Sequence, residues 1–425
     1  MSRGNGSRWF YCYVPHGMSG GATSALIPLF AYGLGGTVAE VGIIAAATSI
    51  ASVPAFILWG GLSDRLGRRK VFLLIGFLGS AVSFVAMAAS TTMSQFYLAN
   101  LLIGFLGAAS GPVGAVLVME TAERKQWPAR LALLSRISGV GWVVGLLLGI
   151  AWLTIGPRLV GEVGAMRALF VIGAALALLS ALLATNWLAE PRERVERRDI
   201  PLVDIHFRVE RVKYLPMRLL HFLDPRDHRE GRARLSGSLK VYLASVFLMF
   251  SGFTAFYGFF PIFLKEAYAL SSPEIFAVFI ASQVTSAVFY PRVGRWIGDR
   301  GSRPVQLYAC LGRSLLFPAF FFVSLLGLPR SSLFGASLLL HAGVGLCWAM
   351  INVAGSTLVS RLAPQGGRAE ALGAYNAMQG FGSIVGPLLG GLVAGVYGFG
   401  WAVGASVAFV LAGSGVLAAH RVSEK

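Results

Sequence analysis

Polar side chains inside long apolar runs are the residues of this sequence that could do chemistry. Such groups are costly to place in hydrocarbon, so each is a candidate to bind a substrate or carry a proton. The candidates are His16, Asn100, Arg136, Tyr257, Gln283, His341, Asn352, Asn376 and Gln379.

The amide side chains predict a polar wall in the second half of the chain. Asn376 and Gln379 are three residues apart, so they share a helix face. With Gln283 and Asn352 they could hydrogen-bond a ligand's hydroxyl or amide groups. The alternative is hydrogen bonding between helices.

The ionisable candidates have two interpretations each. His16 and His341 titrate in a range useful for proton transfer, although a neutral, hydrogen-bonded ring explains them equally well. Arg136 would favour an anionic group, or an ion pair with Glu120 or Glu123. No Asp or Glu stands at mid-depth of an apolar run, so a buried carboxylate is not available for proton coupling.

An aromatic run surrounds Tyr257. Together with Phe256, Phe259 and Phe260 it could form an aromatic side of a pathway, or it could serve packing alone.

No enzyme or cofactor site follows from the sequence. Cys12, Cys310 and Cys347 are scattered through apolar runs and predict neither a disulfide framework nor a metal site. The segment HFLDPRDH, residues 221–228, contains metal-capable types at a spacing that matches no known site. Because no glycine-rich nucleotide loop follows a strand, ATP-driven transport is disfavoured. We expect no catalytic residues, no cofactor and no metal.

The elements that position these residues are transmembrane helices. Hydrophobic residues make up 56% of the 425 residues and charged ones 13%. A helix needs about 20 apolar residues to cross the hydrocarbon core. Twelve runs qualify: Phe10–Tyr32, Val38–Trp59, Val71–Ala89, Phe96–Met119, Leu131–Ile155, Leu169–Leu188, Val241–Leu264, Ile275–Ile297, Val305–Leu328, Leu333–Leu358, Ala371–Tyr397 and Trp401–Ala419.

These runs predict an all-α membrane protein of twelve transmembrane helices. Its parts are an N-terminal six-helix bundle (1–189), a cytoplasmic linker (190–240) and a C-terminal six-helix bundle (241–425). Within the linker, Phe207–Leu223 mixes apolar and basic residues. It predicts an amphipathic helix on the membrane surface, with a solvated linker as the alternative.

The net charge of +17 comes from short segments between apolar runs, which disfavours a nucleic-acid partner. One alternating set of loops is rich in Lys and Arg. The other set contains only Arg158, Arg167, Lys265 and Arg330. By the positive-inside rule the rich set and both termini are cytoplasmic, in a multi-pass protein of the cell membrane. The excess charge also predicts attraction to anionic lipids.

The two halves repeat each other. GGLSDRLGRRK (Gly60–Lys70) recurs as GRWIGDRGSRP (Gly294–Pro304), and GVGWVVGLLLG (Gly139–Gly149) recurs as GFGSIVGPLLG (Gly380–Gly390). Such glycines let helix backbones approach closely, for packing and for rocking between two packed arrangements.

The first of these loops resembles the signature loop of the major facilitator superfamily, through Gly60, Asp64, Arg65, Gly67, Arg68 and Arg69; Asp299, Arg300 and Arg303 resemble its second copy. The resemblance implies two pseudo-symmetric six-helix bundles. It also implies a secondary transporter with alternating access, here expected as a monomer with a small-molecule substrate. Protons are a candidate coupling ion.

The same resemblance implies a cytoplasmic latch that is closed when the cavity faces outward. Asp64 would lie against the start of the eleventh helix, and Arg68 would reach Glu120 or Glu123. The alternative is a topology anchor. The gating residues are Gly60, Asp64, Arg65, Gly67, Arg68, Glu120, Asp299, Arg300 and Arg303.

Residues 41–70 are most similar to the drug-exporter branch, so export of lipophilic drug-like compounds is expected. The alternatives are a facilitator or symporter for a neutral polar metabolite such as a sugar or nucleoside, and a non-transporting receptor or enzyme. Two departures weaken proton-driven drug export: Asn100 replaces the exporters' arginine, and Leu146 replaces the proline of their Gly-Pro element. In this family the ninth helix braces the outside, so Arg313 is expected to brace or snorkel.

The latch predicts an effect of Asp64→Asn. The amide loses the charge interaction with a helix start, worth about 0.3–1 kcal/mol, so the inward-open population should rise. Crosslinking between the halves on the cytoplasmic side measures this population; unchanged crosslinking would refute the latch.

Overall fold

The computed structural model describes residues 8–121, 126–188, 236–363 and 368–419, and within these ranges the chain is helical apart from short connections. The predicted amphipathic segment Phe207–Leu223 and the 221–228 segment lie outside the described residues. Nine of the described helices are long and apolar enough to cross a membrane.

The described residues form twelve passes, as predicted. The first bundle contains η1 (Arg8–Cys12) with α1 (Tyr13–Ser24) and α2 (Leu26–Gly33), then α3 (Val38–Leu66), α4 (Arg69–Ala89), α5 (Met93–Gly107) with α6 (Ser110–Thr121), and α7 (Trp127–Trp187). The second bundle contains α10 (Gly237–Ala267), α11 (Ser272–Arg300), α12 (Ser302–Ser324), α13 (Arg330–Leu362), α14 (Arg368–Tyr397) and α15 (Phe399–Ala419).

Prolines explain why the first and fourth passes are each split into two helices. Pro28 has no amide hydrogen to donate to the carbonyl of Ser24, where α1 ends. Pro112 likewise has none for the carbonyl of Ala108, which caps α5 just before α6 begins. A proline therefore accounts for the break in both the first and the fourth pass of the first bundle.

The fifth and sixth passes both belong to α7, which reverses direction at Gly161. This residue has φ 75° and ψ 168°, a conformation that only glycine adopts without strain. The indole Nε1 of Trp152 donates to the Ala165 carbonyl across this turn at 2.8 Å.

The second pass of each bundle starts with the same cap. The amide of Thr37 donates to Glu40 Oε2 at 2.7 Å before α3, and the amide of Ser271 donates to Glu274 Oε2 at 2.7 Å before α11. Each acid stands three residues after its cap, where it satisfies an amide left free by the helix start. The repeat therefore extends to the connections.

Glycines of the repeated segments pack the fifth pass on the first and the eleventh on the seventh. A Cβ at Gly145 would lie 2.1 Å from the Met18 carbonyl oxygen, and one at Gly386 would lie 2.4 Å from the Ser251 carbonyl oxygen. Only glycine permits such backbone contact. These repeated glycines therefore pack helices within each bundle.

A different set of small residues joins the two bundles through α3 and α14. A Cβ at Gly42 would lie 2.3 Å from the Pro387 carbonyl oxygen, and Gly391 packs on the same glycine. The contact runs on to Ala39 beside Gly395. We call this backbone contact the α3–α14 seam.

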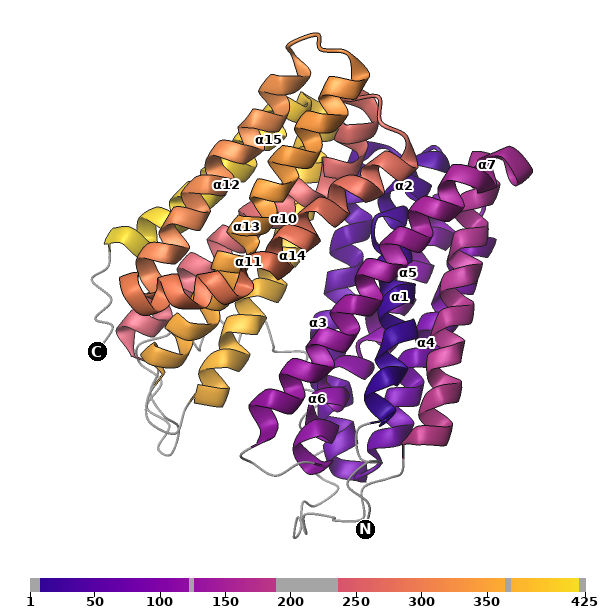
Figure 1. The fold of residues 1–425 in the computed structure, drawn as a ribbon, viewed down its shortest axis with the longest axis vertical. Helices are drawn as coiled ribbons and strands as arrows, with labels where there is room; N and C mark the ends of the chain where they lie inside the picture. Colours follow the sequence, from indigo (N-terminus) through magenta and orange to yellow (C-terminus); the bar gives the residue numbers. More distant parts are fainter. Residues whose placement is uncertain (1–7, 122–125, 189–235, 364–367, 420–425) are drawn as a thin grey trace.

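The seam lies on the side of the molecule away from the chain ends, which we call the distal side. Figure 1 shows the two bundles converging there and diverging toward the end at which the N-terminus is marked, the terminal side. The main contacts of α6, which ends on the terminal side, are with helices of its own bundle. Among the described residues the halves are therefore packed together distally and diverge terminally.

Gly42→Leu should open the distal side, because its side chain would overlap the Pro387 carbonyl. Spin labels at the exposed residues Leu159 and Leu326, one on each bundle, should move apart in this variant. Gly404→Leu is the matched control, since nothing lies within 4 Å of a Cβ at Gly404. An unchanged label distance in Gly42→Leu would contradict the seam.

Candidate functional site

A cavity of about 370 Å³ lies between the bundles near the middle of the passes. This volume suits a small organic molecule. The first bundle supplies three of the lining residues and the second bundle supplies the rest: Ser24, Trp142, Leu146, Phe250, Phe253, Thr254, Tyr257, Phe279, Ser282, Gln283, Arg313, His341, Trp348 and Ser383.

Aromatic rings are the commonest kind of side chain in the cavity wall. Trp142 on α7 is the ring from the first bundle, and it faces a set from the second bundle that includes Phe250, Phe253, Phe279 and Trp348. Phe250 stands edge-on to both Phe253 and Trp348. Such rings bind aromatic or lipophilic groups by burying apolar surface area and by making edge-to-face contacts.

Tyr257 and His341 form a hydrogen-bonded pair in this wall. His341 Nδ1 lies 2.7 Å from the Val278 carbonyl oxygen, which can only accept, so Nδ1 carries a proton. In the neutral ring Nε2 then accepts from the Tyr257 hydroxyl at 3.1 Å. The arrangement matches the neutral, hydrogen-bonded alternative for His341 and places both predicted residues at the cavity.

The other aromatic residues predicted beside Tyr257 pack inside the second bundle. Phe256, Phe259 and Phe260 are fully buried, and Phe256 stacks on Phe317 with centroids 3.9 Å apart. These three rings support the cavity wall from behind.

Arg313 lines the cavity and does not snorkel to the membrane surface. Its side chain is 2% exposed, so the charge does not reach the membrane surface. Its guanidinium carbon lies 4.3 Å from the Phe253 ring centroid and 5.4 Å from that of Trp348. The long Arg313 side chain extends from α12 and places its charge between α10 and α13.

Of the predicted amides, Gln283 lines the cavity. Gln379 and Asn376 precede the lining residue Ser383 by four and seven positions, so they continue its helix face toward the terminal side. Asn352 follows Trp348 by four positions and continues that face in the same direction. By position, these three amides therefore lie on helix faces that continue from the cavity toward the terminal side.

The three candidates of the first bundle are not among the cavity-lining residues. His16 Nε2 lies 3.5 Å from Ser110 Oγ. Asn100 is fully buried and donates to the Phe96 carbonyl at 2.7 Å. Arg136 is exposed on α7. In the described structure these three residues do not lie together in one site.

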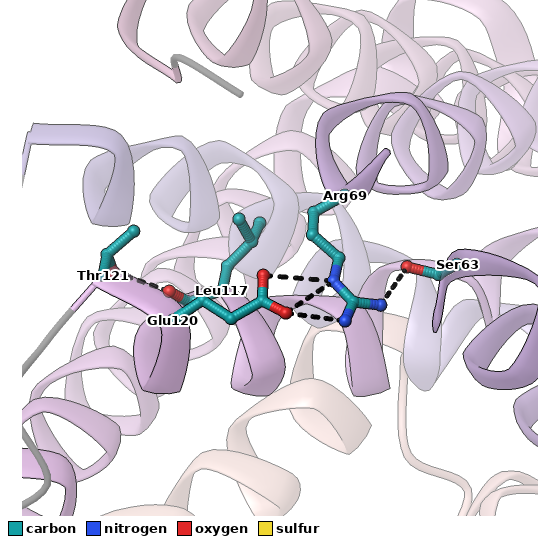
Figure 2. A network of polar contacts seen from close by, with 5 residues as sticks. All are labelled: Ser63, Arg69, Leu117, Glu120 and Thr121. Carbon is teal, nitrogen blue, oxygen red and sulfur yellow. Dashed lines mark hydrogen bonds and ion pairs between the residues drawn. The ribbon is translucent and has the colours of Figure 1, made fainter. Parts of the chain in front are cut away.

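The signature loop forms a polar network at the terminal end of the first bundle (Figure 2). Arg69 binds Glu120 through Nε and Nη2, at 2.6 Å for the shorter contact, and Nη1 donates to Ser63 Oγ at 2.9 Å. The sequence pattern assigned Glu120 to Arg68, which is exposed. The left-handed Gly67 (φ 62°) ends α3, and Arg69 then starts α4 as a buried residue.

Other parts of the predicted latch can be placed only in part. Gly60 and Arg65 lie in the last turns of α3. The Asp64 side chain and Glu123 lie outside the described part of the structure.

The second loop holds helix ends within its own bundle. Arg303 Nη2 donates to the Ala418 carbonyl at 2.7 Å, and in the first bundle Lys70 Nζ donates to the Thr185 carbonyl at 2.7 Å. In each case a cation at the start of the third pass binds the end of the sixth, where the helix dipole favours positive charge. Asp299 and Arg300 are exposed.

The distal side carries a contact between the bundles that sequence reasoning missed. Lys265 Nζ lies 2.9 Å from Glu162 Oε1 and 5.9 Å from the Tyr32 ring centroid. Lys265 belongs to α10, whereas Glu162 and Tyr32 belong to the first bundle. This ion pair adds to the α3–α14 seam on the closed side.

Metal chemistry finds no support in the described ranges, which contain no group of three His, Cys, Asp or Glu residues able to hold an ion. The three cysteines are free and buried.

Comparison with known proteins identifies relatives over almost the whole chain. The family model described as Major Facilitator Superfamily matches residues 9–353 and 242–424. Multidrug resistance protein 1 of Bacillus subtilis is 25% identical over 358 residues, which cover 83% of this chain and 80% of that protein. Multidrug resistance protein MdtG of Citrobacter koseri is 25% identical over 410 residues, covering 92% and 88%.

A solved structure shares the fold. The crystal structure of a mutant of the nucleoside transporter NupG superimposes with a TM-score of 0.73 at 16% identity, covering 97% of this chain and 99% of that one. The family match, the twelve passes and the cavity between two bundles agree. The chain therefore belongs to the Major Facilitator Superfamily, whose members are membrane transporters rather than enzymes.

Proposed function

We propose that this protein exports lipophilic small organic compounds by alternating access. The observation that carries the proposal is the cavity between the bundles, in whose wall aromatic rings are the commonest kind of side chain. Flat apolar surfaces accept many shapes of lipophilic molecule, whereas a sugar site would need more polar groups aimed at each hydroxyl. The relatives named multidrug resistance proteins support the same substrate class.

The asymmetry between the two sides supports a rocking mechanism. The halves are joined distally by the α3–α14 seam and the Lys265–Glu162 pair. If the terminal side is cytoplasmic, as its basic loops indicate, the cavity in this state is open toward the cytoplasm. A compound would enter from there, and separation of the distal contacts would release it outside.

Uptake or facilitated passage of a neutral polar metabolite is the second candidate. Gln283 offers hydrogen bonds in the cavity, and the Tyr257 hydroxyl oxygen can still accept one. Counterflow experiments on the purified protein in liposomes separate the two functions. Concentrative movement of a neutral lipophilic fluorophore under an imposed pH gradient is expected for the exporter; counterflow of a sugar or nucleoside, without pH dependence, would refute it.

Trp142→Ala should weaken handling of aromatic substrates. The change removes the ring that the first bundle contributes, so the half-saturating concentration should rise roughly tenfold, equivalent to about 1.4 kcal/mol. Trp401→Ala is the matched control, because that ring is 71% exposed on α15. Equal transport by the two variants would mean that substrate does not contact Trp142.

A further inference from the structure

Arg313 carries a positive charge at the central cavity without a carboxylate beside it. Its side chain is 2% exposed, and its Nε is buried without a hydrogen-bond partner in the described part of the chain. The residues that line the cavity include no Asp and no Glu. An ionised group in hydrocarbon is costly, and such groups usually pair with an acid or mark a substrate pathway.

Three aromatic rings surround the guanidinium of Arg313. The carbon at its centre lies over the rings of Phe253, Trp348 and Phe317, at 4.3, 5.4 and 5.9 Å from their centroids. Cation–π contact uses the flat face of the group. The N–H donors of a guanidinium lie in its plane, so a ring over its face does not occupy them.

The polar neighbours of Arg313 are neutral groups. Tyr257, His341, Cys310 and Cys347 interact with it electrostatically. The Tyr257 and His341 side chains are already bonded to each other, and Cys310 contacts the Met249 sulfur at 3.2 Å. None of these side chains supplies the negative charge that the guanidinium fork fits best.

From this geometry we propose that the preferred substrates are amphiphilic monoanions: one carboxylate on an aromatic or lipophilic body. The carboxylate binds the in-plane donors of Arg313, and the body lies among Trp142, Phe279 and the neighbouring rings. The inference rests on the proposed function, because it names the substrate class of the same cavity. The competing explanation is that Arg313 only ties α10, α12 and α13 together through its rings.

Two matched ligands separate these explanations. Naphthoate and naphthamide share one ring system and differ in charge, and naphthylmethylammonium supplies the opposite charge. We would titrate each by calorimetry at neutral pH into the full-length protein in phosphatidylcholine nanodiscs, with empty nanodiscs subtracted. The wild-type protein should bind naphthoate at least about tenfold more tightly than naphthamide.

Variants assign the preference to Arg313. Arg313→Met keeps much of the volume and should abolish the preference while leaving naphthamide binding unchanged. Arg313→Lys, which keeps the charge without the fork, should retain part of it. Arg292→Met is the matched control, since Arg292 also stacks on a ring, Phe289 at 5.4 Å, but is exposed on α11. Melting temperatures show whether each variant is folded.

Several results would overturn the proposal. Equal binding of naphthoate and naphthamide by the wild-type protein would remove the anion preference while leaving lipophilic export intact. A preference that survives in Arg313→Met would remove Arg313 from it. Binding of none of the three ligands would refute the proposed function as well. Loss of naphthoate binding in phosphatidylglycerol nanodiscs would identify a lipid headgroup, rather than a free carboxylate, as the occupant.

Discussion

Backbone contact between α3 and α14 is the constraint on which the arrangement of the two bundles depends. Gly42 and Gly391 meet without side chains between them, so the bundles come together on the distal side. The bundles diverge on the other side, and the cavity lies near mid-depth between α1 and α7 of the first bundle and the helices of the second. The Lys265–Glu162 pair is half-exposed and adds little by comparison, since such pairs are worth about 1 kcal/mol or less.

The cost of polar groups in hydrocarbon explains where the charges lie. Lys70 and Arg303 bind helix ends at the bundle surfaces, and Arg69 shares an ion pair with Glu120. Within the cavity wall Tyr257 and His341 are hydrogen-bonded to each other. Arg313 is different, because aromatic faces hold it in place of a carboxylate. The described cavity wall therefore carries one charge among aromatic rings.

Sequence reasoning could predict the twelve passes and the repeat, because apolar runs and recurring motifs are local signals. Three of its candidates, Tyr257, Gln283 and His341, line the cavity. It missed the position of Arg313 at the cavity, because helix order places α12 on the outside of the bundle. The length of the arginine side chain lets its charge reach the cavity from there. Nothing in the sequence distinguishes the glycines of the α3–α14 seam from those that pack helices within a bundle, because tertiary structure decides which helix each glycine contacts. The caps at Thr37 and Ser271 correspond to S/T-x-x-E patterns, which the sequence contains at equivalent places in both halves.

The central claim is that the bundles rock about the cavity, so that one side closes as the other opens. Double electron–electron resonance on two label pairs tests it directly: Leu66 with Ala418 on the terminal side, and Leu159 with Leu326 on the distal side, all exposed positions. When a transported compound is added, we expect a second population in which the terminal distance is shorter and the distal distance longer. Distances that change in the same direction, or a distal distance that never changes, would contradict alternating access.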